Sequence, residues 1–358
     1  MNIHQEIPAE VTKALADYID SRHEEVRTIG APVDKAVGHL SRFILEGGKR
    51  VRPLYAWTGF LAARGLSGEE DPDAVIRAIS SLEFIQACAL IHDDIIDASD
   101  TRRGNPTIHR SVARTHQESR WCGSADHFGE SVAILVGDLA LVWAEDMFLE
   151  SGLSPAALTR ARAPWRGMRT EVIGGQLLDI SLEAAGTEDI AAANSVNLYK
   201  TAAYTIERPL HLGAAIAGAD DTVISALRHY GRDIGVAFQL RDDLLGVFGD
   251  PAITGKPAGD DLRQGKRTEL LCTALTYADR HDPAAAAELR RHVGRTKDDA
   301  IIQRLTSIIQ DTGAEDVIES RISDLKASGI DYLSSAHIPD EVFTLLKELA
   351  LKATERRY

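Results

Sequence analysis

Residues 89–104 read ALIHDDIIDASDTRRG, and they join an apolar helical segment to a loop rich in charge. Asp93 and Asp97 are four positions apart, so they lie on one face of a helix. Carboxylates at this spacing repel each other, and the negative end of the helix dipole adds to the cost. The stretch therefore predicts a helix end neutralised by cations, and Mg²⁺ or Mn²⁺ is the natural choice because it takes oxygen ligands.

Helical periodicity continues on both sides of this stretch, while alternating strand patterns are rare. In residues 33–46 an apolar stripe stops at Gly47-Gly48, which is typical of a helix terminus. The same periodicity predicts helices over residues 73–98, 129–150, 166–184, 190–218, 222–249, 268–280, 298–310, 314–329 and 340–354. Residues 99–127 and 249–267 are instead irregular and polar, as functional loops often are. Because no Ser/Gly-rich linker divides the chain, we expect one all-α domain over residues 1–358.

Composition narrows the function classes. The net charge of −14 argues against a nucleic-acid binder with a broadly basic surface. The three cysteines (Cys88, Cys122 and Cys272) form no CxxC pair and suit a reducing compartment. The N-terminus lacks an apolar signal core, and residues 132–144 are too short to span a bilayer. We therefore expect a soluble, cytoplasmic protein without a membrane span.

A second acidic cluster occurs in FQLRDDLLGVFGD, residues 238–250. Asp242 and Asp243 follow an apolar helical stretch, and basic residues come after them, as Arg102 and Arg103 come after the first cluster. Guanidinium groups are forked donors that suit phosphate oxygens. Two helices with an Asp pair and a basic loop predict one metal–diphosphate site seen from opposite walls. The alternative is a coincidence of two solvated helix ends.

Three further segments carry weaker signals. GGKRVRP (47–53) places Lys49, Arg50 and Arg52 after two glycines, without the spacing of a nucleotide-binding P-loop, so we expect a second anion site there. The alternative is a solvated, basic helix start. Lys200-Thr201 and the pair Gln176 and Asp179 are more often ordinary polar residues on a helix.

Taken together, the motifs resemble those of the trans-type isoprenyl diphosphate synthases over residues 35–275. GGKRVRP, DDIID with TRRG, GQLLD, KT, FQLRDD and GKPAGDDLRQGKRT occur in that family's order, and the chain is most similar to bacterial geranylgeranyl diphosphate synthases. The resemblance implies an isoprenoid-synthase-type helical bundle around a central cavity, and a homodimer. It also implies head-to-tail condensation of isopentenyl diphosphate with dimethylallyl, geranyl or farnesyl diphosphate.

The resemblance assigns roles to individual residues. Mg²⁺ would be held by Asp93, Asp97 and Asp242, assisted by Asp94 and Asp243. Isopentenyl diphosphate would be bound by Lys49, Arg52, Gln86 and Arg103. The allylic diphosphate would be surrounded by Arg102, Lys200, Thr201, Gln239, Lys256 and Lys266. Among all of these, Asp93, Asp97, Asp242, Lys200 and Lys266 are assigned to catalysis.

The chain departs from the family pattern at Gly246, which stands where a third Asp is usual. Metal binding at the second cluster must then depend on Asp242 and Asp243, with Asp250 or Asp261 acting through water.

Small residues before the first Asp predict a long product. Cys88 and Ala89 leave room for the growing chain, whereas Ile85 and Phe84 are the next bulky side chains. We therefore expect geranylgeranyl diphosphate, with a farnesyl or longer polyprenyl product as the alternative. A class I terpene cyclase would need no second anion site, and an inactive regulatory subunit would be expected to lack the first Asp motif.

Overall fold

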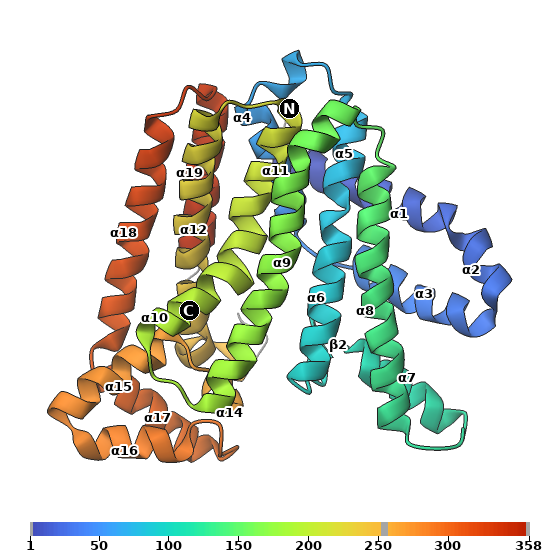
Figure 1. Cartoon of the computed structure of the whole chain (residues 1–358). Helices are drawn as coiled ribbons and strands as arrows, with labels where there is room; N and C mark the ends of the chain where they lie inside the picture. The colour runs from blue at the N-terminus through green and yellow to red at the C-terminus, as the bar shows by residue number, and fades with distance from the viewer. Residues whose placement is uncertain (1–2, 252–256, 356–358) are drawn as a thin grey trace. The chain divides into compact units, whose positions relative to one another are not determined.

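The computed structural model describes residues 3–251 and 257–355, and over these residues the chain is predominantly helical (Figure 1). Within them, β1 (Thr101–Arg102) and β2 (Asn105–Pro106) form one short antiparallel pair. The all-α expectation is therefore confirmed. The chain forms two compact units, Met1–Ala163 with Leu212–Ala219 and Pro164–His211 with Asp220–Tyr358. That both units act as one domain stays a prediction.

The first unit is a helical bundle in which α6 (Leu82–Ile96) packs along α8 (Ala125–Leu149) (Figure 1). The ring of Phe84 on α6 lies 5.6 Å from that of Tyr18 and 6.1 Å from that of Trp143 on α8. These edge-on contacts fix α6 against its neighbours. The other elements of this unit are α1 (Ile3–Ser21), α2 (His23–Ile29), α3 (Ala31–Leu45), α4 (Val51–Ala62), η1 (Gly65–Ser67), α5 (Pro72–Ser80) and α7 (Ile108–Glu118), with β1 and β2.

The second unit is built around α12 (Asp221–Phe248), which packs against α18 (Ala314–Ser334) and the π-helical segment η2 (Asn197–Glu207). Glycines make the α12–η2 contact close: a Cβ at Gly231 would lie 2.5 Å from Glu207 Cα, and one at Gly235 would lie 2.5 Å from Ala202 Cα. The remaining helices of this unit are α10 (Ile190–Val196), α14 (Asp260–Gln264), α15 (Glu269–His281), α16 (Pro283–His292), α17 (Asp299–Asp311) and α19 (Asp340–Thr354). Two helices, α9 (Pro155–Ala185) and α11 (Arg208–Ala217), contribute residues to both units.

Several predicted boundaries were wrong, for local reasons. The single helix expected over residues 73–98 is interrupted at Ser81, whose hydroxyl donates to the Ala78 carbonyl. Helix α9 begins at Pro155 rather than near residue 166, because the Ser154 hydroxyl caps Ala157 N–H at 3.1 Å and proline suits the first turn. The loop expected over residues 99–127 contains α7, because two of its five buried residues are the histidines His109 and His116, which apolar periodicity does not count.

One apolar stretch within the described residues, Pro72–Ile96, is long and apolar enough to cross a membrane by composition alone. Its most apolar window is 72% buried inside the protein, as expected of a core helix. Burial in the core thus accounts for the composition of this stretch.

We predict that Gly213→Ala destabilises the protein by about 2–3 kcal/mol, because two backbones must move apart to admit a methyl group. A Cβ at Gly213 would lie 1.7 Å from the Ala56 carbonyl oxygen on α4. Gly38→Ala on α3 is the matched control: nothing lies within 4 Å of its Cβ position. This control should be stabilised by about 0.5–1 kcal/mol. Urea unfolding measures both, and equal stability of the two variants would contradict the packing argument.

Candidate active site

The first carboxylate cluster lies where α6 ends. Asp97 closes the helix, its N–H donating to the Asp93 carbonyl at 2.8 Å, and Ser99 N–H donates to the Asp94 carbonyl at 2.9 Å. These bonds gather the three predicted carboxylates at one carboxyl-terminal helix end, where the dipole disfavours negative charge. The predicted cluster of Asp93, Asp94 and Asp97 is thus brought together locally, by one helix end.

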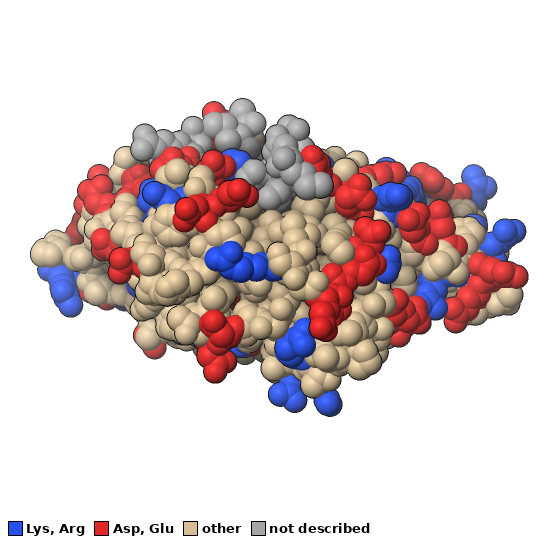
Figure 2. Space-filling view, turned by 90° about the horizontal axis from the view of Figure 1, so that it is seen from above, with Lys and Arg blue, Asp and Glu red and all other residues tan. Residues whose placement is uncertain are grey.

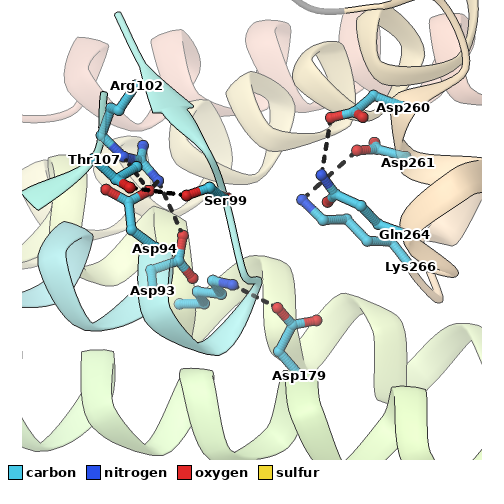
Figure 3. A network of polar contacts seen from close by, with 11 residues as sticks. Asp93, Asp94, Ser99, Arg102, Thr107, Asp179, Asp260, Asp261, Gln264 and Lys266 are labelled. Atoms are coloured by element: carbon cyan, nitrogen blue, oxygen red, sulfur yellow. Dashed lines mark hydrogen bonds and ion pairs between the residues drawn. The ribbon is translucent and has the colours of Figure 1, made fainter. Parts of the chain in front are cut away.

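Arg102 supplies the nearest positive charge from β1. Its Nε donates to Asp94 Oδ1 at 2.7 Å, and its Nη2 lies 3.4 Å from Asp93 Oδ2 (Figure 3). The hairpin that carries Arg102 is tied to the helix end because the Thr107 hydroxyl donates to the Ser99 carbonyl at 2.9 Å. Sequence reasoning assigned Arg102 to a substrate anion, and in this structure the guanidinium balances the carboxylates.

Asp94 is 1% exposed, and this burial raises its pKa to about 6 although Arg102 partly opposes the shift. Its Oδ2 atom is buried without a hydrogen-bond partner. A buried carboxylate oxygen in this state is costly, and a cation at that atom would satisfy it.

The hairpin turn brings two distant motifs together. Arg103 and Gly104 have φ values of 53° and 77°, the pattern of a tight two-residue turn of type I′. The Arg103 guanidinium packs over the Phe43 ring, with 5.8 Å from Cζ to the ring centroid. It also lies against Gly47, where a Cβ would be 3.0 Å from Arg103 Nη1. The TRRG loop therefore adjoins the start of GGKRVRP.

The three cations of GGKRVRP have different environments. Arg50 is 4% exposed and donates to Glu83 Oε2 at 2.8 Å and to the Ile44 carbonyl at 2.7 Å, so it is a buried structural residue. Lys49 is exposed and Arg52 is half-buried at the start of α4. Desolvation lowers the pKa of Arg103, and the nearby charges of Arg102, Arg50 and Arg52 lower it further. This crowding of cations is an anion-binding environment.

The predicted chain-length residues lie along α6, on more than one face. Ile85 is buried, whereas Gln86 and Ala89 are half-buried. Cys88 faces α8: its Sγ lies 3.8 Å from His92 Nδ1, and His92 Nε2 lies 3.1 Å from the Ile134 carbonyl. Burial raises the pKa of the Cys88 thiol to about 12, so it behaves as a small apolar side chain.

In the second unit, Lys200 and Thr201 lie in the π-helical segment η2, a geometry often found at functional sites. Lys200 Nζ lies 2.5 Å from Asp179 Oδ2 of α9. Figure 3 labels Asp179 and draws this ion pair as a dashed line. The backbones approach closely here, since a Cβ at Gly175 would lie 2.2 Å from Lys200 N. The helical prediction for residues 190–218 was therefore right about helix but missed the change to π geometry.

Thr201 begins a chain of hydrogen bonds that ends at the second carboxylate cluster. Its hydroxyl donates to Gln239 Oε1 at 2.6 Å, and Gln239 Nε2 donates to Asp243 Oδ1 at 2.8 Å. Asp243 is 3% exposed, and burial raises its pKa well above the usual range, with the charge of Asp261 adding to the effect. Its Oδ2 has no hydrogen-bond partner. Three residues predicted separately are thus linked in space.

Asp261 fills the space beside Gly246. A Cβ at Gly246 would lie 2.0 Å from Asp261 Oδ2, and Lys266 Nζ lies 3.6 Å from Asp261 Oδ1 (Figure 3). Of the two acids considered as replacements for the usual third Asp, Asp261 is buried at this cluster and Asp250 is exposed. Asp242 is half-buried one residue before Asp243. Lys256 lies outside the described residues.

Sequence reasoning missed two carboxylates that organise these clusters. Asp179 was read as an ordinary polar residue, yet it pairs with Lys200. Glu83 was not singled out, although it places a charge in the first turn of the otherwise apolar start of α6. A lone acid in an apolar helical segment was the signal that could have identified it.

The oxygen donors suit a hard divalent cation. In residues 3–251 and 257–355 no group of three or more His, Cys, Asp or Glu side chains is arranged to hold a metal ion by itself. Each cluster does present a buried, unsatisfied carboxylate oxygen, on Asp94 and on Asp243. This fits Mg²⁺, which typically binds one or two carboxylates and takes its remaining ligands from water and substrate phosphates.

Basic side chains form no continuous patch on the face of the molecule drawn in Figure 2. On the face drawn in Figure 2, acidic side chains form clusters and basic side chains lie scattered between them. The basic side chains that matter for the site gather around Arg103 instead.

Comparisons with known proteins agree with this site. The sequence matches the polyprenyl synthetase family over residues 34–309. It is 35% identical to a geranylfarnesyl diphosphate synthase of Aeropyrum pernix, over 80% of this chain and 83% of that protein. It is also 32% identical to a (2E,6E)-farnesyl diphosphate synthase of Mycobacterium bovis, over 87% and 80% of the two chains.

A solved structure is also highly similar. The geranylgeranyl pyrophosphate synthase of Corynebacterium glutamicum, complexed with isoprenyl diphosphate and magnesium, shares 58% identity and a TM-score of 0.97, with 100% of both chains covered. The chain carries the motifs, the helical fold and the carboxylate and cation clusters described above, and it therefore belongs to the polyprenyl synthetase family of prenyltransferases.

Proposed function

We propose that the protein condenses isopentenyl diphosphate with an allylic diphosphate and releases geranylgeranyl diphosphate. The main support for this proposal is that one unit holds both a carboxylate cluster, at Asp93 to Asp97, and an adjacent cluster of cations around Arg103. A condensing enzyme needs two kinds of diphosphate subsite, one that promotes ionisation and one that only binds. The similarity to the Corynebacterium glutamicum enzyme supports the same choice of product.

Each cluster has a part in the proposed reaction. Lys49, Arg52, Gln86 and Arg103 bind the diphosphate of isopentenyl diphosphate and leave its double bond facing the allylic carbon. Arg102, Lys200, Thr201, Gln239, Lys256 and Lys266 bind the allylic diphosphate, and their donors stabilise charge that builds on it as it departs. Asp93, Asp97 and Asp242 would hold Mg²⁺, with Asp94, Asp243 and Asp261 assisting, and the bound ion would neutralise that charge as a Lewis acid.

The condensation then proceeds by addition and proton loss. The double bond of isopentenyl diphosphate attacks the allylic cation, a new carbon–carbon bond forms, and loss of one proton restores neutrality. The departed diphosphate is the proposed proton acceptor, held by the same lysine and arginine donors. Apolar surroundings protect the cation from water. We place the enzyme in the cytoplasm, where its three cysteines stay reduced.

The test of this proposal is the product mass formed by the purified protein from isopentenyl diphosphate and each allylic primer in turn. We expect a geranylgeranyl product, and we expect chelation of divalent metal to abolish it. Asp97→Ala should lower turnover by about 100-fold or more without lowering the melting temperature, since it removes one of several crowded charges. Asp100→Ala is the control, because Asp100 is exposed and pairs with Arg110. Failure to consume isopentenyl diphosphate would refute the proposal.

Product length is proposed to depend on α6. One helical turn rises about 5.4 Å, which is of the order of one extended isoprene unit. Ala89 lies one turn before Asp93 and is half-buried, whereas Ile85 lies a turn deeper and is buried. The tail of the growing chain is therefore expected to pass Cys88 and Ala89 and to stop near Ile85.

We predict that Ala89→Phe shortens the main product by one isoprene unit while the first condensation continues. A phenyl ring at this level blocks the path of the tail, whereas Ala89→Ser, of nearly wild-type size, should leave the product unchanged. Cys88→Phe should also shorten the product and should in addition lower stability, because Cys88 is buried beside His92. Mass spectrometry of the products decides, and wild-type length in both phenylalanine variants would locate the floor elsewhere.

A homodimer is proposed from an exposed apolar stripe on α8. Phe128, Leu135, Val142 and Leu149 recur every seventh residue, and their exposed fractions are 36%, 67%, 56% and 54%. Large apolar side chains at this spacing form one continuous helix face, which water solvates poorly. A second copy of this face is the proposed partner, because two identical stripes can pack together around a twofold axis.

We predict that Leu135→Glu with Val142→Glu halves the mass measured by light scattering at micromolar concentration. Charge placed in the centre of the stripe would be desolvated in a dimer, which is costly. Leu66→Glu is the control, since Leu66 is 60% exposed but lies in η1, away from α8. A monomeric wild-type protein, or a double variant that stays dimeric, would contradict the assigned interface.

A further inference from the structure

Glu83 is a buried acid in the first turn of α6. It is 4% exposed, its Oε2 accepts from Arg50 Nη1 at 2.8 Å, and its Oε1 is buried without a hydrogen-bond partner. Taking a carboxylate out of water is expensive, and one ion pair compensates it incompletely. The position of this charge therefore calls for an explanation beyond packing.

A second arginine lies beside the same carboxylate. At Gly48 a Cβ would be 3.4 Å from Arg50 Nη1, 3.6 Å from Arg103 Nη2 and 3.6 Å from Glu83 Oε2. The two guanidinium groups and the carboxylate thus converge at the backbone of Gly48. The charge of Glu83 favours the protonated form of Arg103, against the desolvation that lowers the Arg103 pKa.

Both arginines also have unusual backbones. Arg50 has φ 51° and Arg103 has φ 53°, in the left-handed region that residues other than glycine seldom adopt. Such conformations persist only where the surroundings enforce them, and they concentrate at binding sites. The guanidinium of Arg50 is held by Glu83, by the Ile44 carbonyl at 2.7 Å and by the Thr12 hydroxyl at 3.3 Å. Its side chain thereby fixes the turn that precedes α4.

The charges near Gly48 do not balance. Arg50, Arg52 and Arg102 all place positive charge near Arg103. The carboxylates in this neighbourhood are Glu83 from α6 and, through Arg102, the Asp93–Asp94 cluster. Arg50 is satisfied by Glu83, whereas Lys49 is exposed on the other side of the turn. Glu83 therefore allows cations to be close together while leaving a surplus of positive charge for an anion.

We propose that Glu83 is the positioning residue of the isopentenyl diphosphate subsite. Its carboxylate holds the GGKRVRP turn and the TRRG loop against each other, so that Lys49, Arg52 and Arg103 address one diphosphate group. Glu83 itself does not touch the substrate. This inference rests on the proposed function, because it assigns that subsite to the substrate that is not ionised.

The test is Glu83→Gln, which keeps the shape of the side chain and removes its charge. We expect the KM for isopentenyl diphosphate to rise about tenfold or more, while the KM for the allylic substrate changes less than about twofold. Isothermal titration with inorganic diphosphate should show a matching loss of affinity at this subsite. Lys49→Ala serves as the reference for loss of one direct contact.

The control is Glu70→Gln in the same unit. The Glu70 side chain is 8% exposed and accepts from Ser154 N–H at 3.0 Å, away from both loops. It should lose stability without a selective change in either KM. If Glu83→Gln instead leaves both the KM for isopentenyl diphosphate and the diphosphate affinity unchanged, the positioning role is overturned.

A double variant separates positioning from stability if Glu83→Gln folds poorly. Glu83→Gln with Arg50→Met removes both charges of the pair, so the melting temperature should recover towards the wild-type value. Because Arg50 also fixes the turn through the Ile44 carbonyl and the Thr12 hydroxyl, we expect the KM for isopentenyl diphosphate to stay raised in this variant. Recovery of both quantities would show a merely structural ion pair and overturn the proposal. Failure of the proposed function is distinct, because the wild-type protein would then not consume isopentenyl diphosphate.

Discussion

Negative charge held at the carboxyl end of a buried helix is the constraint on which the first unit depends. Asp94 is 1% exposed at the end of α6, where the helix dipole and two neighbouring carboxylates all oppose its ionisation. In the TRRG hairpin, Arg102 donates a hydrogen bond to Asp94. Arg103, at the tip of the same hairpin, lies against the glycine turn that precedes α4. One electrostatic problem therefore determines where the hairpin, the turn and the cations lie.

The second unit also buries a carboxylate, but different groups surround it. Asp243 is buried on α12, where burial and the charge of Asp261 raise its pKa, and the Gln239 amide and the charge of Lys266 oppose this shift only in part. Glycines at positions 231 and 235 let the π-helical segment approach α12 closely enough for Thr201 to reach Gln239. Backbone packing and side-chain chemistry are therefore coupled in this unit, because the hydrogen-bond chain requires the close approach.

Two carboxylates outside the first Asp motif, Asp261 and Glu83, compensate for unfavourable features of the motifs. Asp261 lies where a side chain at position 246 would be, so the Gly246 departure from the family pattern comes with an acid from another segment. Glu83 compensates Arg50 and adjoins Arg103, so a turn rich in positive charge can be packed against a helix. Both acids lie close to glycine backbones, where the absence of a Cβ leaves room for them.

The sequence by itself determined the helical class and the principal clusters, because apolar periodicity and the spacing of Asp93 and Asp97 are local properties of a helix. It also paired each Asp cluster with basic residues, since those lie nearby in the chain. The tertiary structure decided which cations are structural and which acid lies at each cluster. Arg50 is buried and donates to Glu83, Lys200 pairs with Asp179, and Asp261 rather than Asp250 adjoins Gly246. Likewise, apolar periodicity predicted an ordinary helix around Lys200, where the structure has π geometry. Such pairs join residues far apart in the chain, so the packing of the helices determines which of the many charged residues come into contact.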